Sequence, residues 1–139
     1  MRDVQTLIKM QKLYVDEQRK VLAEKQRQAD ALHAALRDLE DNLEAEKKGE
    51  GAHKEGSFLI GAFIRRELSR KEDLASALTQ TRREIEVSRE KLALLFEELK
   101  RFEIVQENWD EQAAAERLRN ENAAYDEQAG TRHERNKEG

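Results

Sequence analysis

The chain has 139 residues, of which 37% are hydrophobic, 5% aromatic and 40% charged. A chain this short and polar has room for one domain and cannot fill a broad globular core. The 26 Lys and Arg residues and the 30 Asp and Glu residues give a net charge of -4, and the two signs are interleaved along the chain. This pattern argues against a nucleic-acid-binding surface.

The residue types that the chain lacks narrow its class further. It has no proline, and its leucines and isoleucines recur periodically, which favours helix over disorder. It has no cysteine, which excludes disulfides and cysteine-based zinc sites. No apolar run reaches the roughly 20 residues of a membrane span, and the N-terminus lacks a secretory signal core. We therefore expect a cytoplasmic protein.

Apolar residues in the first third of the chain recur in alternating steps of three and four, which is the heptad pattern of a coiled coil. This pattern predicts a helix over about residues 2–48, although its first half also carries polar residues on the same seam. The apolar seam residues are Val4, Ile8, Val15, Leu22, Ala29, Leu32, Leu36, Leu39 and Leu43, and the polar ones are Gln11, Gln18 and Lys25.

Three closely spaced glycines, Gly49, Gly51 and Gly56, predict a turn over residues 49–57, because glycine weakens helices and favours turns. A second heptad pattern follows and predicts a helix over about residues 58–127. Its seam residues are Leu74, Leu78, Thr81, Ile85, Ser88, Leu92, Leu95, Leu99, Phe102, Gln106, Trp109 and Ala113.

Two helices joined by one short turn fold back most simply as a long antiparallel two-helix coiled-coil hairpin, an all-α fold. We expect a single domain over residues 1–130 and a flexible tail over 131–139. Facing residue numbers should have a constant sum, either 103, with Ile8 against Leu95, or 110, with Ile8 against Phe102. In both registers the second helix overhangs the first beyond Trp109.

No catalytic or metal-binding constellation is readable in the sequence. His33, His53 and His133 lack the paired spacing of metal ligands on a helix and are better explained as exposed histidines. A two-helix hairpin offers no concave pocket that would bury paired carboxylates. We therefore expect neither an enzyme nor a bound cofactor.

Two apolar regions are candidates for binding other proteins. Phe58, Phe63 and Ile64 either cap the hairpin core beside the turn or form an uncovered recognition surface. Trp109, the only tryptophan, either packs under the start of the first helix or offers a binding hot spot.

The polar seam residues also have two interpretations. Gln11, Gln18, Lys25, Thr81 and Ser88 can fix the register of the two helices at some cost in stability. Alternatively, they mark a half of the hairpin that parts or bends when a partner binds.

Nearly the whole chain resembles the FliJ family of flagellar export proteins in length, helix pattern and turn position. Leu99, Phe102, Gln106 and Glu107 resemble the family motif L-x-x-W-x-x-x-Q-E. The segment 125–129, with Tyr125, Asp126, Glu127 and Ala129, is similar to the family's apolar-D-E-x-A ending. Phe102 and Tyr125 depart from the commoner Trp and Leu or Met.

This resemblance implies a component of a type III export apparatus that acts as a stalk in the hexameric export ATPase. It also implies contacts with the export gate and with substrate chaperones, and recruitment to the inner membrane only through such partners. On this basis Ile8, Phe102, Trp109 and Tyr125 would meet the ATPase, and Phe58, Phe63 and Ile64 would meet the gate. The alternative is a structural coiled-coil scaffold or adaptor without an export role.

Overall fold

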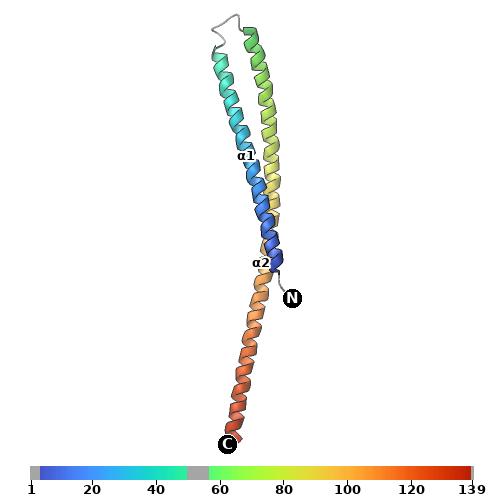
Figure 1. The fold of residues 1–139 in the computed structure, drawn as a ribbon, viewed down its shortest axis with the longest axis vertical. Helices are drawn as coiled ribbons and strands as arrows, with labels where there is room; N and C mark the ends of the chain where they lie inside the picture. The colour runs from blue at the N-terminus through green and yellow to red at the C-terminus, as the bar shows by residue number, and fades with distance from the viewer. Residues whose placement is uncertain (1–3, 50–56, 139) are drawn as a thin grey trace. The chain divides into compact units, whose positions relative to one another are not determined.

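Two long helices make up nearly all of the chain that the computed structural model describes, residues 4–49 and 57–138. Helix α1 runs Gln5–Gly49 and helix α2 runs Ser57–Glu138, with no strand in either described range (Figure 1). The helices pack against each other, which confirms the predicted all-α helical hairpin. The centre of the predicted glycine-rich turn, residues 50–56, lies outside the described residues.

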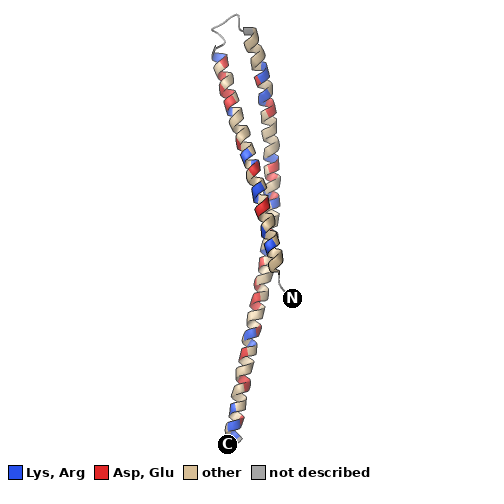
Figure 2. Cartoon of the chain, in the orientation of Figure 1, with Lys and Arg blue, Asp and Glu red and all other residues tan. Residues whose placement is uncertain are grey.

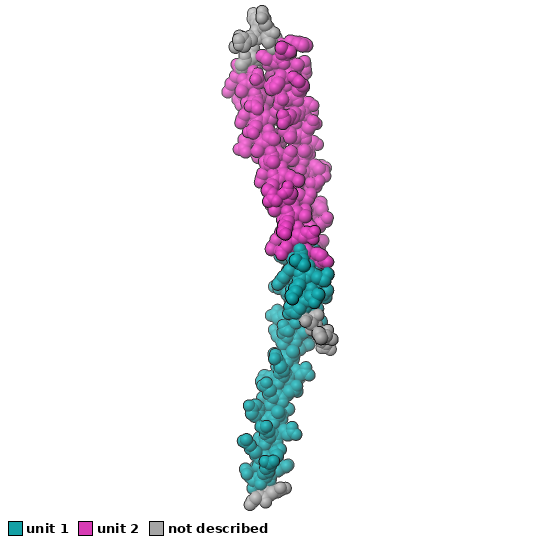
Figure 3. Space-filling view, viewed as in Figure 1, with its two compact units in different colours: residues 1–13, 95–139 teal, residues 14–94 magenta. Residues whose placement is uncertain are grey.

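The chain divides into two compact units, each made from a piece of both helices (Figure 3). Unit 1 combines residues 1–13 with 95–139, and unit 2 is the continuous segment 14–94. Within unit 2 the segments of α1 and α2 lie side by side and run in opposite directions (Figure 1). Each unit therefore builds its interior from a single seam between two helical segments.

The seam of unit 2 buries the residues that the heptad pattern predicts. Val15, Leu39 and Leu43 of α1 and Leu78 and Ile85 of α2 are all at most 8% exposed. Acidic and basic residues are interleaved along both helices (Figure 2). The interior is therefore one narrow stripe of side chains rather than a layered core.

The seam of unit 1 is short because α1 contributes only its first residues. Val4, Ile8 and Leu99 are at most 9% exposed, while Phe102 and Trp109 are half-buried. All residues from 110 to 137 are exposed. The predicted overhang of α2 beyond Trp109 is thus present as a helix that α1 does not cover.

Three polar contacts between the helices favour the register with a constant sum of 110, whereas the bonds of Gln11 to Leu95 and of Gln18 to Ser88 fall between the two registers. In unit 1 the Val4 N–H donates to Gln106, the residue that this register places opposite. In unit 2 Lys25 pairs with Glu84 and Glu40 pairs with Lys71, each within one residue of the 110 register. The 103 register would instead place Leu99 opposite Val4 and Leu78 opposite Lys25.

At its C-terminal end α2 continues to Glu138, beyond the end predicted near residue 127. Residues 131–138 are therefore helical where a flexible tail was expected. The segment contains no proline, and the Thr131 hydroxyl donates to the Glu127 carbonyl at 2.9 Å. Arg135 and Lys137 lie in the last turn, where positive charge interacts favourably with the helix dipole.

Truncating a buried seam residue should destabilise the hairpin. Ile85→Ala removes a side chain that is 8% exposed, so we expect a loss of about 2 to 3 kcal/mol in the free energy of unfolding. Val87→Ala, at a side chain that is 51% exposed, should change it by less than about 0.5 kcal/mol. Urea denaturation followed by circular dichroism measures both, and equal losses would show that the seam is misassigned.

Candidate functional site

The start of α1 is held by a glutamine of α2. The Val4 N–H donates to Gln106 Oε1 at 3.0 Å, and the Val4 carbonyl accepts the first helical hydrogen bond from Ile8 at 2.9 Å. Gln106 Nε2 donates in turn to Asp110 Oδ1 at 3.0 Å, which orients the amide. Backbone N–H groups in the first turn of a helix have no partner within that helix. Gln106 therefore acts as a cap supplied by the opposite helix.

The four residues predicted to meet the ATPase lie in unit 1 but differ in exposure. Ile8 is only 8% exposed and lines a shallow groove together with Gln106 and Asp110. Phe102 and Trp109 are half-buried on the same seam, whereas Tyr125 is 72% exposed on the part of α2 that α1 does not cover. Ile8 thus serves mainly as packing, and the accessible apolar surface belongs to Trp109 and Tyr125.

Removing the Gln106 cap should weaken the pairing at the start of α1. We expect Gln106→Ala to lower the free energy of unfolding by about 1 kcal/mol, the usual effect of losing a helix cap. The matched control is Gln112→Ala on the exposed part of α2, which should cost less than about 0.5 kcal/mol. Hydrogen exchange adds a local readout, because the Val4 amide should exchange faster in the Gln106 variant alone. Unchanged exchange there would contradict the capping role.

The three residues predicted to meet the gate lie at the beginning of α2, in unit 2. Phe58 is 78% exposed, whereas Phe63 and Ile64 are half-buried. Leu59, at 72% exposure, continues the accessible apolar surface. Phe63 and Ile64 are partly packed, as expected for residues that cap the hairpin core. Phe58 and Leu59 remain uncovered, as expected for a recognition surface.

The polar seam residues form hydrogen bonds within each unit. In unit 1 Gln11, 7% exposed, donates its Nε2 to the Leu95 carbonyl at 3.0 Å. In unit 2 Gln18 donates to the Ser88 hydroxyl, and the Thr81 hydroxyl donates to the Ala77 carbonyl at 2.9 Å. Among the described residues no buried side-chain nitrogen or oxygen lacks a partner. The bonds of Gln11 and Gln18 join α1 to α2 and can fix register, whereas the bond of Thr81 lies within α2 and cannot.

The hydrogen bond from Gln18 to Ser88 provides a test of this register role. Ser88 is 2% exposed, so Ser88→Ala leaves the Gln18 amide without its acceptor and should cost about 1 kcal/mol. Replacing both partners, as Gln18→Leu with Ser88→Ala, should be neutral or stabilising because an apolar seam needs no hydrogen bond. Thermal melts compare the two variants, and a double variant less stable than Ser88→Ala would refute the explanation.

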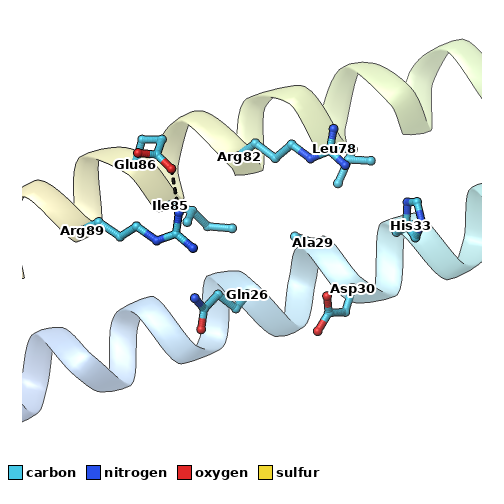
Figure 4. Close-up of a pocket in the computed structure, with 9 residues that line it drawn as sticks. All are labelled: Gln26, Ala29, Asp30, His33, Leu78, Arg82, Ile85, Glu86 and Arg89. Carbon is cyan, nitrogen blue, oxygen red and sulfur yellow. Dashed lines mark hydrogen bonds and ion pairs between the residues drawn. The ribbon is translucent and has the colours of Figure 1, made fainter.

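A groove in unit 2 lies where small Ala29 occupies the seam opposite Leu78 and Ile85 (Figure 4). Its rim carries His33, Asp30, Arg82 and Arg89, and Arg89 pairs with Glu86 at 2.8 Å. The ionisable side chains on this rim are all exposed. The groove is thus a gap left by a small seam residue, and it does not enclose its charged groups as a catalytic pocket would.

In the part of the chain that the structure describes, His, Asp and Glu residues form no group able to hold a metal ion. Neither α1 nor α2 contains, over its described residues, an apolar stretch long enough to cross a bilayer. Comparisons with protein-family models, with curated proteins and with solved structures gave no match.

The heptad pattern predicted the seam but not the polar contacts that join the two helices along it. The bond between Val4 and Gln106 and the ion pairs of Lys25 with Glu84 and of Glu40 with Lys71 join residues far apart in sequence. A signal existed for Gln106 and Lys25, since both are polar residues at seam positions. No feature of the sequence indicated that the Leu59 side chain is exposed.

Proposed function

We propose that the protein is a component of a type III export apparatus that binds the export ATPase ring as a stalk. The observation that carries this proposal is the helical overhang of α2, in which every residue from 110 to 137 is exposed. A helix of this kind can enter a ring lumen while the paired part of unit 1 stays intact. The resemblance of segments 99–107 and 125–129 to the FliJ motifs supports the same assignment.

The overhang also has the surface properties that a binding segment needs. Leu118 is 58% exposed and Tyr125 is 72% exposed, so both can be buried by a partner. Half-buried Trp109 lies where coverage by α1 ends. Large aromatic side chains contribute most to binding when a partner completes their burial. In the proposed stalk these residues face the ATPase.

The beginning of α2 supports the second part of the proposal, contacts with the export gate and with substrate chaperones. Phe58 and Leu59 form an accessible apolar surface in unit 2, separate from the overhang in sequence. The protein would then be cytoplasmic and would reach the inner membrane only through these partners. A structural coiled-coil scaffold without an export role is the alternative, and ATPase binding separates the two.

The ATPase contact is tested with single substitutions in the overhang. We expect Trp109→Ala and Tyr125→Ala to weaken binding to the export ATPase hexamer by about tenfold or more and to reduce ATPase stimulation. Tyr125→Ala is the cleaner variant, because this exposed side chain does not hold the seam. Arg83→Ala and Val87→Ala are matched controls on exposed positions of unit 2 and should bind normally.

Circular dichroism must show native helicity in each variant before binding is compared. If well-folded overhang variants bind and stimulate the ATPase normally, the overhang is not the ATPase contact, and Phe58 and Leu59 become the leading candidates. If the wild-type chain binds no export ATPase, the scaffold alternative replaces the proposal.

A further inference from the structure

The overhang of α2 carries a heptad stripe of its own, here called the tail stripe. Its members, spaced by alternating steps of three and four, are Ala115, Leu118, Asn122, Tyr125 and Ala129. Leu118 and Tyr125 are 58% and 72% exposed. Steps of three and four keep side chains on one helix face, and this pattern is typical of a coiled-coil partner surface.

The tail stripe is not a continuation of the hairpin seam. Leu118 follows Trp109 by nine residues, which places it about 180° around an ideal helix. Continuing the hairpin seam past Ala113 in the same steps would instead reach Glu116 and Asn120, which are polar. The stripe therefore faces away from the side that α1 covers, and α1 cannot serve as its partner.

One edge of the stripe carries two exposed charged residues, Arg119 directly after Leu118 and Asp126 directly after Tyr125. Neither has an ion-pair partner among the residues that the structure describes. We propose that the tail stripe pairs antiparallel with the tail stripe of a second copy of this chain. Leu118 then packs on Ala129 of the second copy, and Tyr125 packs beside Asn122 of the second copy.

In this arrangement Arg119 faces Asp126 of the second copy. Both residues directly follow the second apolar position of a heptad, and these positions meet each other across an antiparallel helix pair. The two-fold symmetry of the dimer repeats the contact, so both copies gain the same ion pair. The remaining flanking positions pair Glu121 with Gln128, Gln112 with His133 and Ala114 with Arg135. No like charges meet at these flanking positions.

Other arrangements of the same two helices bring like charges together. Sliding one helix by a heptad places Arg119 against Arg119 in one direction and Asp126 against Asp126 in the other. A parallel, in-register pair places Glu121 against Asp126. Like-charge contacts exclude competing registers and orientations, so the charge pattern selects the antiparallel pairing described above.

The second copy and the proposed ATPase contact use the same face of the overhang, so they compete for Leu118 and Tyr125. The test uses the full chain alone, without any ATPase, so its outcome does not depend on ATPase binding. Sedimentation equilibrium over a range of concentrations should show a monomer of 16.2 kDa converting to a dimer. Arg119→Asp and Asp126→Arg should each raise the dimer dissociation constant by about tenfold or more, since each creates two like-charge contacts. Combining them swaps the charges and should restore the constant to within about threefold of wild type.

Two matched controls distinguish the stripe from general surface changes. Arg117→Asp makes the same charge reversal two residues away on a position that does not flank the stripe, and it should leave the dissociation constant unchanged. Leu118→Asp should abolish the dimer, whereas Leu94→Asp, at a leucine that is 64% exposed in unit 2, should not.

Three results would overturn the proposal: a monomer at every concentration up to the millimolar range, a dimer insensitive to Leu118→Asp, or a double charge swap that fails to restore dimerisation. Helix damage cannot imitate the expected pattern, because two damaging substitutions would not correct each other. Restored dimerisation in the double variant would therefore establish the Arg119 to Asp126 contact and its antiparallel geometry.

Discussion

Two helices can shield only one stripe of side chains from water, and the stability of each unit depends on the burial of that stripe. Val15, Leu39, Leu78 and Ile85 fill it in unit 2, and Val4, Ile8 and Leu99 fill it in unit 1. Among residues 4–49 and 57–138 no second layer covers this stripe, so a small residue in it leaves an open groove, as Ala29 does. The exposed faces of the same helices remain available to other proteins.

An apolar stripe alone does not determine how the helices align, because a slip of one heptad again places apolar residues together. Polar groups remove this ambiguity. A register with a sum of 103 would place the Lys25 ammonium against Leu78, whereas the observed pairing gives it Glu84 at 3.2 Å. Burying an unpaired ammonium is far less favourable than keeping it beside a carboxylate. The ion pair of Lys25 with Glu84 thus favours the observed register over the alternative.

The sequence was sufficient to predict the helices and their seam, since residues from Leu74 to Trp109 in the second heptad pattern are buried or half-buried as expected. It was not sufficient to choose the register or to identify the Gln106 cap, because both depend on how far long polar side chains reach. For the candidate sites, the pattern identified apolar residues but not their exposure. Ile8 and Phe58 illustrate this, since one is 8% and the other 78% exposed.

The bond between Val4 and Gln106 also has a consequence for the order in which the chain acquires its structure. Contacts between the helices span 59 residues at Lys25, 70 at Gln18, 84 at Gln11 and 102 at Val4. Closing a longer loop costs more entropy, so the pairing nearest the connection forms first and advances toward the termini. During synthesis the first turn of α1 is made before the rest of the hairpin, yet Gln106, its partner, is synthesised about a hundred residues later. The start of α1 is thus the last part of the paired region to become fixed.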